Sequence, residues 1–308
     1  VDAILSECLP FYWICPNLED IIDPDSFIRL PLDDLEASTR LIQEAITNNE
    51  YSRRLPAIRR SKERILNSLQ LAPTISQIVR GHQLLNKTPL HVINLDRRSD
   101  RLDGFMQRLS LASGDRLVSR IERFSAIDGQ DLEMTPEILH MFRGSELPLR
   151  RSQTACALSH LSLWIELINS EHEHYIIFED DAQFTSDFTS RLGELFGQML
   201  DRPQPDVIFL GLSYFDNAFS PMSSNQTLRP VVLENLMGGA FAYVLSKSGA
   251  KRLFEIAQTE GIAYGIDTFV LLNSHRVQSL EAVPNFVSSP VARRNGPVVD
   301  SDIQYEDS

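Results

Sequence analysis

One run of residues has the types and spacing expected of a metal site. An apolar stretch that ends at Phe178 leads directly into Glu179, Asp180 and Asp181. Because side chains alternate between the two faces of a strand, Glu179 and Asp181 are expected on one face and Asp180 on the other. Three adjacent carboxylates repel one another, and a hard cation such as Mg²⁺ or Mn²⁺ relieves that repulsion through oxygen ligands. The alternative is a solvated acidic turn.

A second block places charged residues where a strand is expected to give way to a helix. The apolar stretch 91–95 is followed by a helical pattern over 99–113, with Ser99 as the expected N-cap. The N–H groups at a helix N-terminus can bind phosphate, whereas the alternative is a salt-bridged helix start. The candidate ligand-binding residues of this block are Asn94, Asp96, Arg97 and Arg101.

A third block is an amphipathic helix expected over 153–170. Ser159 and His160 fall outside its apolar stripe and are candidates to approach a ligand, although a helical histidine commonly has a structural role. Trp164 is expected in the core. The predicted buried stripe consists of Leu158, Leu161, Ile165 and Ile168.

Two glycines and one further carboxylate complete the set of candidates. Gly238 and Gly239 precede an apolar strand, where they either let the backbone approach a ligand or form a tight turn. Asp267 stands at the start of a helix expected over 266–274. Asp267 is therefore either a reactive carboxylate or an N-cap.

After residue 87, short apolar runs alternate with amphipathic helices, which predicts an α/β domain with a mainly parallel sheet. Ligands of such sheets bind at the carboxyl ends of the strands. Residues 1–86 form a separate, smaller α/β segment, with a buried strand at 9–15 and helices at 34–49 and 56–70. The expected strands of 87–308 are 91–95, 175–179, 206–210, 240–245 and 279–283, and its further helices are 187–200 and 247–259.

Composition excludes several classes of function. The net charge of −13 argues against broad nucleic-acid binding, which depends on Lys and Arg. Cys8, Cys15 and Cys156 form neither a disulfide framework nor a zinc pattern. No apolar run is long enough to span a bilayer, and no signal-peptide pattern is visible at the start. We therefore expect a cytoplasmic location, with attachment to a membrane surface left open.

Taken together, the blocks resemble glycosyltransferase family 25, which includes bacterial lipopolysaccharide galactosyltransferases and procollagen galactosyltransferases. The resemblance covers about 87–290, and the order and spacing of the blocks also agree. One departure is the lead-in over 151–155, where the family more often has a Gly-Glu-rich sequence. The matching segments are INLDRRSDR (93–101), ACALSHLSLW (155–164), IIFEDDA (176–182), GGAFAYVLSKSGAKRL (238–253) and IDTFV (266–270).

The resemblance implies a GT-A fold and inverting transfer of a hexose, most simply galactose, from a UDP-sugar to a glycan or glycoconjugate. It also implies a divalent metal, expected to be Mn²⁺, held by Glu179, Asp180 and Asp181, with Asp267 as the catalytic base. A metal-dependent nucleotidyltransferase or phosphohydrolase and a non-catalytic nucleotide-sugar-binding module are the alternatives. The residues assigned to the donor are Asn94, Asp96, Arg97, Arg101, Ser159, His160, Gly238 and Gly239.

The N-terminal segment has a resemblance of its own. LPFYWICPNLEDIIDPDSFIRL (9–30) is similar to the C-terminal end of family 10 fucosyltransferases and related GT-B enzymes. Ile14 stands where those enzymes usually have glycine. Only the tail of such a domain is present, so residues 1–86 are expected to have no transferase activity of their own.

Overall fold

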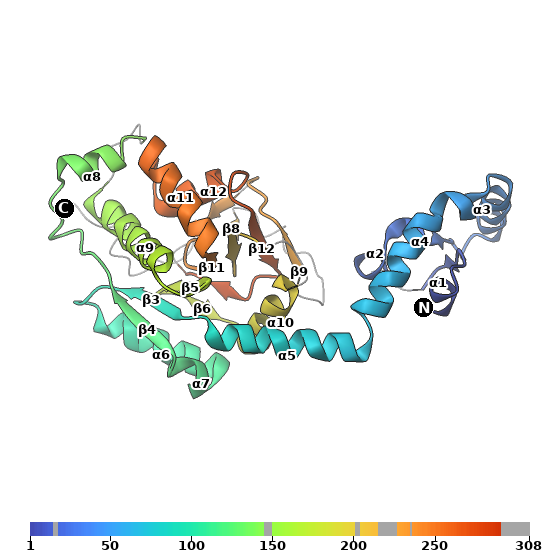
Figure 1. Ribbon diagram of the computed structural model, residues 1–308, viewed down its shortest axis with the longest axis horizontal. Helices are drawn as coiled ribbons and strands as arrows, with labels where there is room; N and C mark the ends of the chain where they lie inside the picture. The colour runs from blue at the N-terminus through green and yellow to red at the C-terminus, as the bar shows by residue number, and fades with distance from the viewer. Residues whose placement is uncertain (15–17, 145–149, 201–203, 215–226, 235, 291–308) are drawn as a thin grey trace. The chain divides into compact units, whose positions relative to one another are not determined.

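The computed structural model describes residues 1–14, 18–144, 150–200, 204–214, 227–234 and 236–290 (Figure 1). The chain divides into two compact units, Val1–Ile78 and Val79–Ser308. The last residue of the strand predicted at 9–15 lies outside the described residues.

The N-terminal unit is a small helical assembly with one pair of short parallel strands, β1 and β2. Its core is formed by Ile4, Ile22, Phe27, Ile58 and Ile65. The elements are α1 (Asp2–Leu5), β1 (Phe11–Tyr12), α2 (Leu18–Ile21), a 3₁₀ turn (Pro24–Ser26), β2 (Ile28–Arg29), α3 (Leu35–Thr47) and α4 (Glu50–Asn67).

Two predictions for this unit need correction. The strand predicted at 9–15 is reduced to two residues, and Trp13 and Ile14 are 56% and 66% exposed rather than buried. The second helix, predicted at 56–70, begins at Glu50, contains Pro56 and ends at Asn67. The helix at 34–49 is confirmed.

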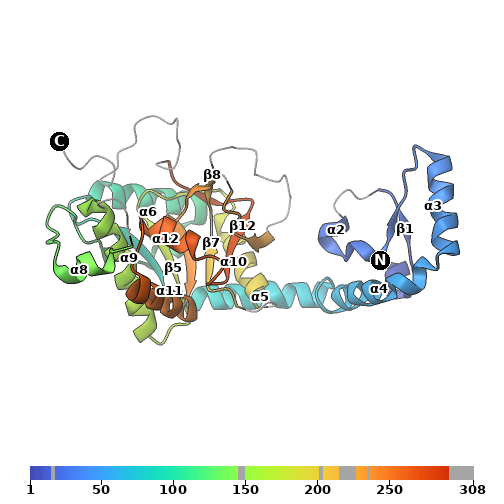
Figure 2. The same ribbon diagram turned by 90° about the horizontal axis from the view of Figure 1, so that it is seen from above.

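The second unit is built on a seven-stranded sheet in the order β4-β3-β5-β11-β7-β12-β9. Figure 2 shows β5, β7 and β12 of this sheet among the helices of the unit. Five of these strands run in one direction, whereas β11 and β9 run antiparallel to their neighbours. The predicted α/β class with a mainly parallel sheet is therefore confirmed. The strands are β3 (Leu90–Asn94), β4 (Ile121–Ser125), β5 (His174–Glu179), β7 (Val207–Phe209), β9 (Thr227–Pro230), β11 (Ala242–Ser246) and β12 (Ser279–Val283).

Two further strand pairs lie beside this sheet. β6 (Gln183–Phe184) pairs with β13 (Val287–Ser288), and β8 (Ser213–Tyr214) pairs with β10 (Leu236–Gly238). Both pairs are antiparallel.

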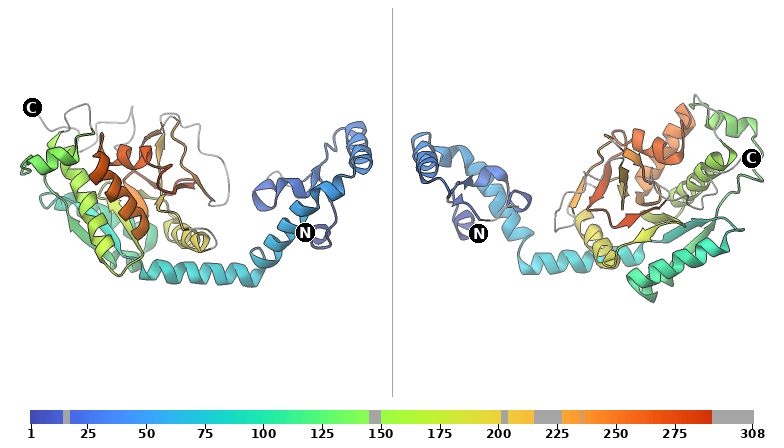
Figure 3. Two further views of the ribbon diagram at one scale, coloured as in Figure 1. Left: turned by 45° about the horizontal axis from the view of Figure 1, so that its top comes forward. Right: turned by 180° about the vertical axis from the view of Figure 1, so that it is seen from behind.

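Helices cover both faces of the sheet (Figure 3). The alternation along β5 sends Tyr175 and Ile177 into one apolar core and Ile176 and Phe178 into the other. The first core includes α9 and α11, and the second includes α6 and α10. The helices of this part of the chain are α5 (Leu71–Lys87), α6 (Ser99–Ser113), α7 (Asp115–Val118), α8 (Pro136–Met141), α9 (Arg151–Asn169), α10 (Phe188–Met199), α11 (Lys247–Glu260) and α12 (Ile266–Leu272).

The sequence predicted the bounds of α6, but its N-cap is Arg98 rather than Ser99. In α9, Ile165 is 40% exposed rather than buried, whereas Ser159 and His160 are fully buried. Trp164 lies in the core, as predicted. Because α9 is covered on several sides, an apolar stripe alone does not identify its buried residues.

Candidate functional site

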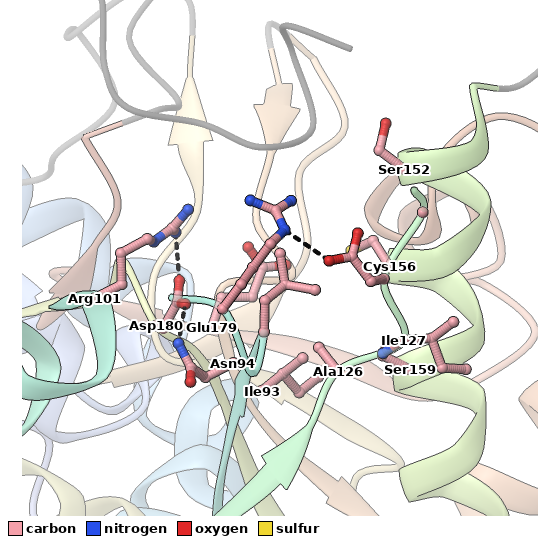
Figure 4. A pocket seen from close by; sticks show the side chains of 14 residues that line it. Ile93, Asn94, Arg101, Ala126, Ile127, Ser152, Cys156, Ser159, Glu179 and Asp180 are labelled. Atoms are coloured by element: carbon pink, nitrogen blue, oxygen red, sulfur yellow. Dashed lines mark hydrogen bonds and ion pairs between the residues drawn. The ribbon is translucent and has the colours of Figure 1, made fainter. Parts of the chain in front are cut away.

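The carboxyl ends of β3, β4 and β5 and the N-terminal half of α9 surround a pocket (Figure 4). The ends of neighbouring parallel strands meet at one edge of a sheet, where ligands of α/β proteins bind. The pocket is lined by Ile93, Asn94, Leu95, Arg97, Arg101, Ala126, Ile127, Asp128, Gly129, Ser152, Cys156, Ser159, Glu179 and Asp180.

Asp180 is held by two residues of the INLDRRSDR block. Asn94 Nδ2 donates a hydrogen bond of 2.7 Å to Asp180 Oδ2, and Arg101 forms an ion pair with Oδ1 (Figure 4). Burial raises the pKa of Asp180, and Arg101 and Asn94 oppose that shift. Both oxygens of this carboxylate are thus engaged by protein groups.

Asp96 and Arg97 are both paired with residues of β4 or the loop after it. Asp96 Oδ1 accepts hydrogen bonds from Arg123 at 2.5 Å and Ser125 at 2.8 Å, and it does not line the pocket. Arg97 Nε donates to Asp128 Oδ2 at 2.6 Å at the pocket wall. Sequence reasoning missed these partners because it did not predict β4.

Two residues from outside the acidic turn after β5 hold it in place. Arg108 donates hydrogen bonds to the carbonyls of Asp180 and Ala182, at 2.7 Å and 2.9 Å. Ser289 Oγ donates to Asp181 Oδ2 at 2.7 Å. Neither partner was predicted, because both contact the turn from distant parts of the sequence.

Asp181 also carries an unsatisfied group. Its Oδ1 atom is buried without a hydrogen-bond partner, and burial together with Glu179 raises the pKa of Asp181 to about 6. A bound cation would satisfy this oxygen and favour the ionised carboxylate. Glu179 lines the pocket and is partly exposed, whereas Asp181 is not among the lining residues. These oxygen donors fit a hard divalent cation.

His160 contacts Glu179 from inside the core. Its Nε2 atom lies 3.4 Å from Glu179 Oε1, and its Nδ1 atom lies 2.8 Å from the hydroxyl of Tyr243. Trp164 Nε1 donates to the same hydroxyl at 2.9 Å. His160 does not line the pocket, so its predicted direct contact with a donor has no support in this geometry.

Ser159 lines the pocket, but its hydroxyl is already used. It donates to the carbonyl of Ala155 at 2.8 Å and accepts from the backbone N–H of Ile127 at 2.9 Å. The first bond lies within α9, and the second joins α9 to the loop after β4 at the wall of the pocket.

Gly238 and Asp267 are neighbours. A Cβ atom on Gly238 would lie 2.6 Å from Asp267 Oδ2. Asp267 occupies the first turn of α12, whose N-cap is Gly265, so the literal N-cap alternative is wrong. Its Oδ1 atom accepts from the N–H of Thr268 at 2.7 Å. Burial raises the pKa of Asp267, and the charge of Glu179 adds to that shift.

The predicted metal ligands are not gathered into one ready-made site. Among the described residues, the group of three ligand atoms within 4.8 Å of one another is Cys156, His160 and Glu179. Asp180 is engaged by Arg101, and Asp181 by Ser289. Within the acidic turn, the carboxylates of Glu179 and Asp181 therefore have oxygen atoms that could still bind a cation.

The fold and the pocket define an α/β protein with a polar site at the carboxyl edge of its sheet. Residues 87–270 match glycosyltransferase family 25, described as "LPS biosynthesis protein". The chain belongs to this family.

Curated relatives align with the same part of the chain. Procollagen galactosyltransferase 2 of Homo sapiens is 28% identical in an alignment of 197 positions that covers 61% of this chain and 31% of that protein. A glycosyltransferase 25 family member of Drosophila melanogaster is 27% identical, over 53% of this chain and 27% of its own. The human protein named inactive glycosyltransferase 25 family member 3 is also 27% identical, over 53% and 28%. The chain spans about a third of the length of these relatives.

A solved structure of UDP-glucose pyrophosphorylase with UDP-glucose aligns with 68% of this chain and 79% of that one. The TM-score of 0.31 and identity of 13% are too low to support an argument. In the described part of the chain, no helix combines the length and apolar character needed to cross a membrane.

Proposed function

We propose that this chain is an inverting, metal-assisted hexosyltransferase that uses a UDP-sugar, most simply UDP-galactose, and a glycan or glycoconjugate acceptor. The observation that carries the proposal is the acidic turn beside the pocket, with the unsatisfied Oδ1 of Asp181 and the partly exposed carboxylate of Glu179. Membership of family 25 and the galactosyltransferase names of its relatives supply the reaction class.

The acidic turn would bind the leaving-group side of the donor. Glu179 and Asp181 would hold a divalent cation, expected to be Mn²⁺, which when bound supplies Lewis-acid stabilisation of the UDP leaving group. Arg97 and Arg101 line the same pocket and would bind phosphate oxygens. Asn94 keeps Asp180 oriented beneath them.

Asp267 would act on the acceptor. As the acceptor hydroxyl attacks the anomeric carbon, its proton passes to the Asp267 carboxylate and the bond to UDP breaks on the opposite face. A partly buried carboxylate with a raised pKa is a stronger base than a fully exposed one. Gly238 leaves the space that this carboxylate occupies.

A second candidate is a nucleotide-sugar-binding module without turnover. One matched human protein is named as inactive, so family membership alone does not decide catalysis. A metal-dependent nucleotidyltransferase or phosphohydrolase would use the same acids but would release pyrophosphate or free phosphate. We further propose that residues 1–86 have no transferase activity of their own.

The test is donor hydrolysis with Mn²⁺ and a panel of UDP-, GDP- and CMP-sugars, read out as nucleotide release. UDP release that EDTA abolishes and Mn²⁺ restores would support the proposal. UDP binding by calorimetry without release would favour the binding module. Preferential binding of GDP or CMP would overturn the donor assignment, and activity that persists fully in EDTA would overturn the metal role.

A further inference from the structure

We propose that His160 is a positioning residue for Glu179. In this proposal, a hydrogen-bond chain that runs in one direction, from Trp164 through Tyr243 to His160, sets the tautomer of the His160 imidazole. The tautomer is a property of this structure alone, whereas its kinetic consequence rests on the proposed function. Trp164, Tyr243 and His160 are 0%, 2% and 0% exposed, so bulk water has no access to them.

The direction of the chain starts at Trp164. An indole Nε1–H can only donate, so the Tyr243 hydroxyl accepts that bond at 2.9 Å. The hydroxyl has a single hydrogen, and His160 Nδ1 lies 2.8 Å away. A buried donor left without an acceptor costs about 1–3 kcal/mol. Tyr243 therefore donates to Nδ1 of His160.

This direction determines what Glu179 meets. A neutral imidazole that accepts at Nδ1 carries its hydrogen on Nε2. The Nε2 atom lies 3.4 Å from Glu179 Oε1 and makes no hydrogen bond in this structure. Catalytic hydrogen bonds are commonly long in the free protein and tighten when substrate binds. His160 thus holds a fully buried donor, without another hydrogen-bond partner, next to the carboxylate of Glu179 that lines the pocket.

The same atoms could instead form a site for a softer metal. Cys156, His160 and Glu179 offer ligand atoms within 4.8 Å of one another. A metal on Nε2 requires a lone pair there, so the hydrogen would move to Nδ1 and be donated to Tyr243. The tyrosine hydrogen would then lose its buried acceptor. The geometry favours the positioning role for this reason.

The first experiment reads the tautomer in the full chain. Nitrogen-15 NMR at mildly alkaline pH distinguishes the two tautomers by their ring-nitrogen shifts, and the signal absent from His160→Gln belongs to His160. We expect an Nε2–H tautomer that Tyr243→Phe converts toward a mixture. An Nδ1–H tautomer in the unmodified chain would overturn the proposal.

The second experiment compares two amides at position 160. Gln places its N–H donor near the Nε2 position, whereas Asn ends near the Nδ1 position. We expect His160→Asn to lower kcat and Mn²⁺ affinity by about 10- to 100-fold, and Gln to restore most of both with similar melting temperatures. Equal losses in folded Gln and Asn variants would contradict positioning through Nε2.

The third experiment uses Co²⁺ as a spectroscopic probe of the competing site. We expect no thiolate-to-cobalt absorption band from Cys156. A band lost in Cys156→Ser but kept in the Cys8→Ser/Cys15→Ser control would overturn the proposal. The NMR and cobalt measurements do not depend on turnover, so a failure of the proposed function and a failure of this inference are distinguishable.

Discussion

A Cβ atom on Gly238 would lie 2.6 Å from Oδ2 of Asp267, so these two residues occupy adjoining space. Among the described glycines, positive φ angles occur at Gly114 and Gly261 and not at Gly238. A left-handed backbone is therefore not the reason for a glycine at position 238. The close approach therefore explains the glycine better than a tight turn does. It also gives a way to displace Asp267 without altering its chemistry.

Gly238→Ala should reduce turnover about 100-fold, because displacing a catalytic group by about 1 Å can cost that much. The measurement is steady-state kcat, combined with Asp267→Asn in a double-mutant cycle. If Gly238 acts through Asp267, the double variant is no slower than Asp267→Asn alone. Additive losses would show that the glycine serves another group.

Asp267→Asn should lower turnover by about two to four powers of ten if Asp267 is the base. The amide oxygen can still accept the N–H of Thr268, so the melting temperature at neutral pH should change little. Near-normal turnover in this variant would leave Asp267 with only a structural role.

The pH dependence provides a separate test of the same residue. Burial raises the pKa of Asp267, so the acid limb of the turnover profile should lie above the ordinary value of about 3.9. The folded state holds this proton more tightly than the unfolded state, so the resulting stability is present at low pH. That stability is lost as pH rises through the folded pKa. Asp267→Asn should remove this contribution from unfolding measured against pH.

The sequence predicted the helices and strands better than it predicted the hydrogen-bond partners of the site residues. α6 was placed correctly because Phe105 and Leu109 form a buried helical stripe. β4 was missed because it is the edge strand of the sheet, and only Ile121 and Phe124 give its sequence an apolar character. The bond from Ser289 to Asp181 joins residues 108 positions apart. No local pattern encodes such a contact, so the acidic turn was predictable but its partners were not.

Arg101→Gln should weaken UDP binding at least about 10-fold, because it removes a pocket guanidinium and leaves the buried Asp180 without its ion pair. Calorimetry with UDP is the measurement. Arg98→Gln is the matched control, since Arg98 pairs with Asp100 and does not line the pocket. Equal losses in both variants would indicate a general effect of positive charge.

Asp181→Ala should abolish metal-dependent turnover while leaving the fold intact. The side chain has one hydrogen-bonded oxygen and one unsatisfied oxygen, so its removal also relieves a buried polar group. Mn²⁺ titration followed by electron paramagnetic resonance measures the loss of binding directly. Ser289→Ala is the matched comparison, because it should only loosen Asp181 and should retain part of the Mn²⁺ affinity. Unchanged Mn²⁺ affinity in Asp181→Ala would exclude Asp181 as a ligand.

The start of the second unit can be tested by truncation. A Cβ on Gly81 would lie 2.5 Å from the backbone nitrogen of Gly197, so α5 packs closely against α10 at this residue. Leu85 is 1% exposed in the core, and Arg120 donates to its carbonyl at 2.8 Å. A chain spanning 79–308 should therefore keep its fold and donor hydrolysis. A chain spanning 88–308 should be destabilised by at least the roughly 2–5 kcal/mol typical of emptying one buried leucine site.

The measurement is urea unfolding of the two truncated chains. Equal unfolding midpoints would place the boundary of the second unit at residue 87, where the family match begins. Loss of hydrolysis by a folded 79–308 chain would instead show that residues 1–78 contribute to the site.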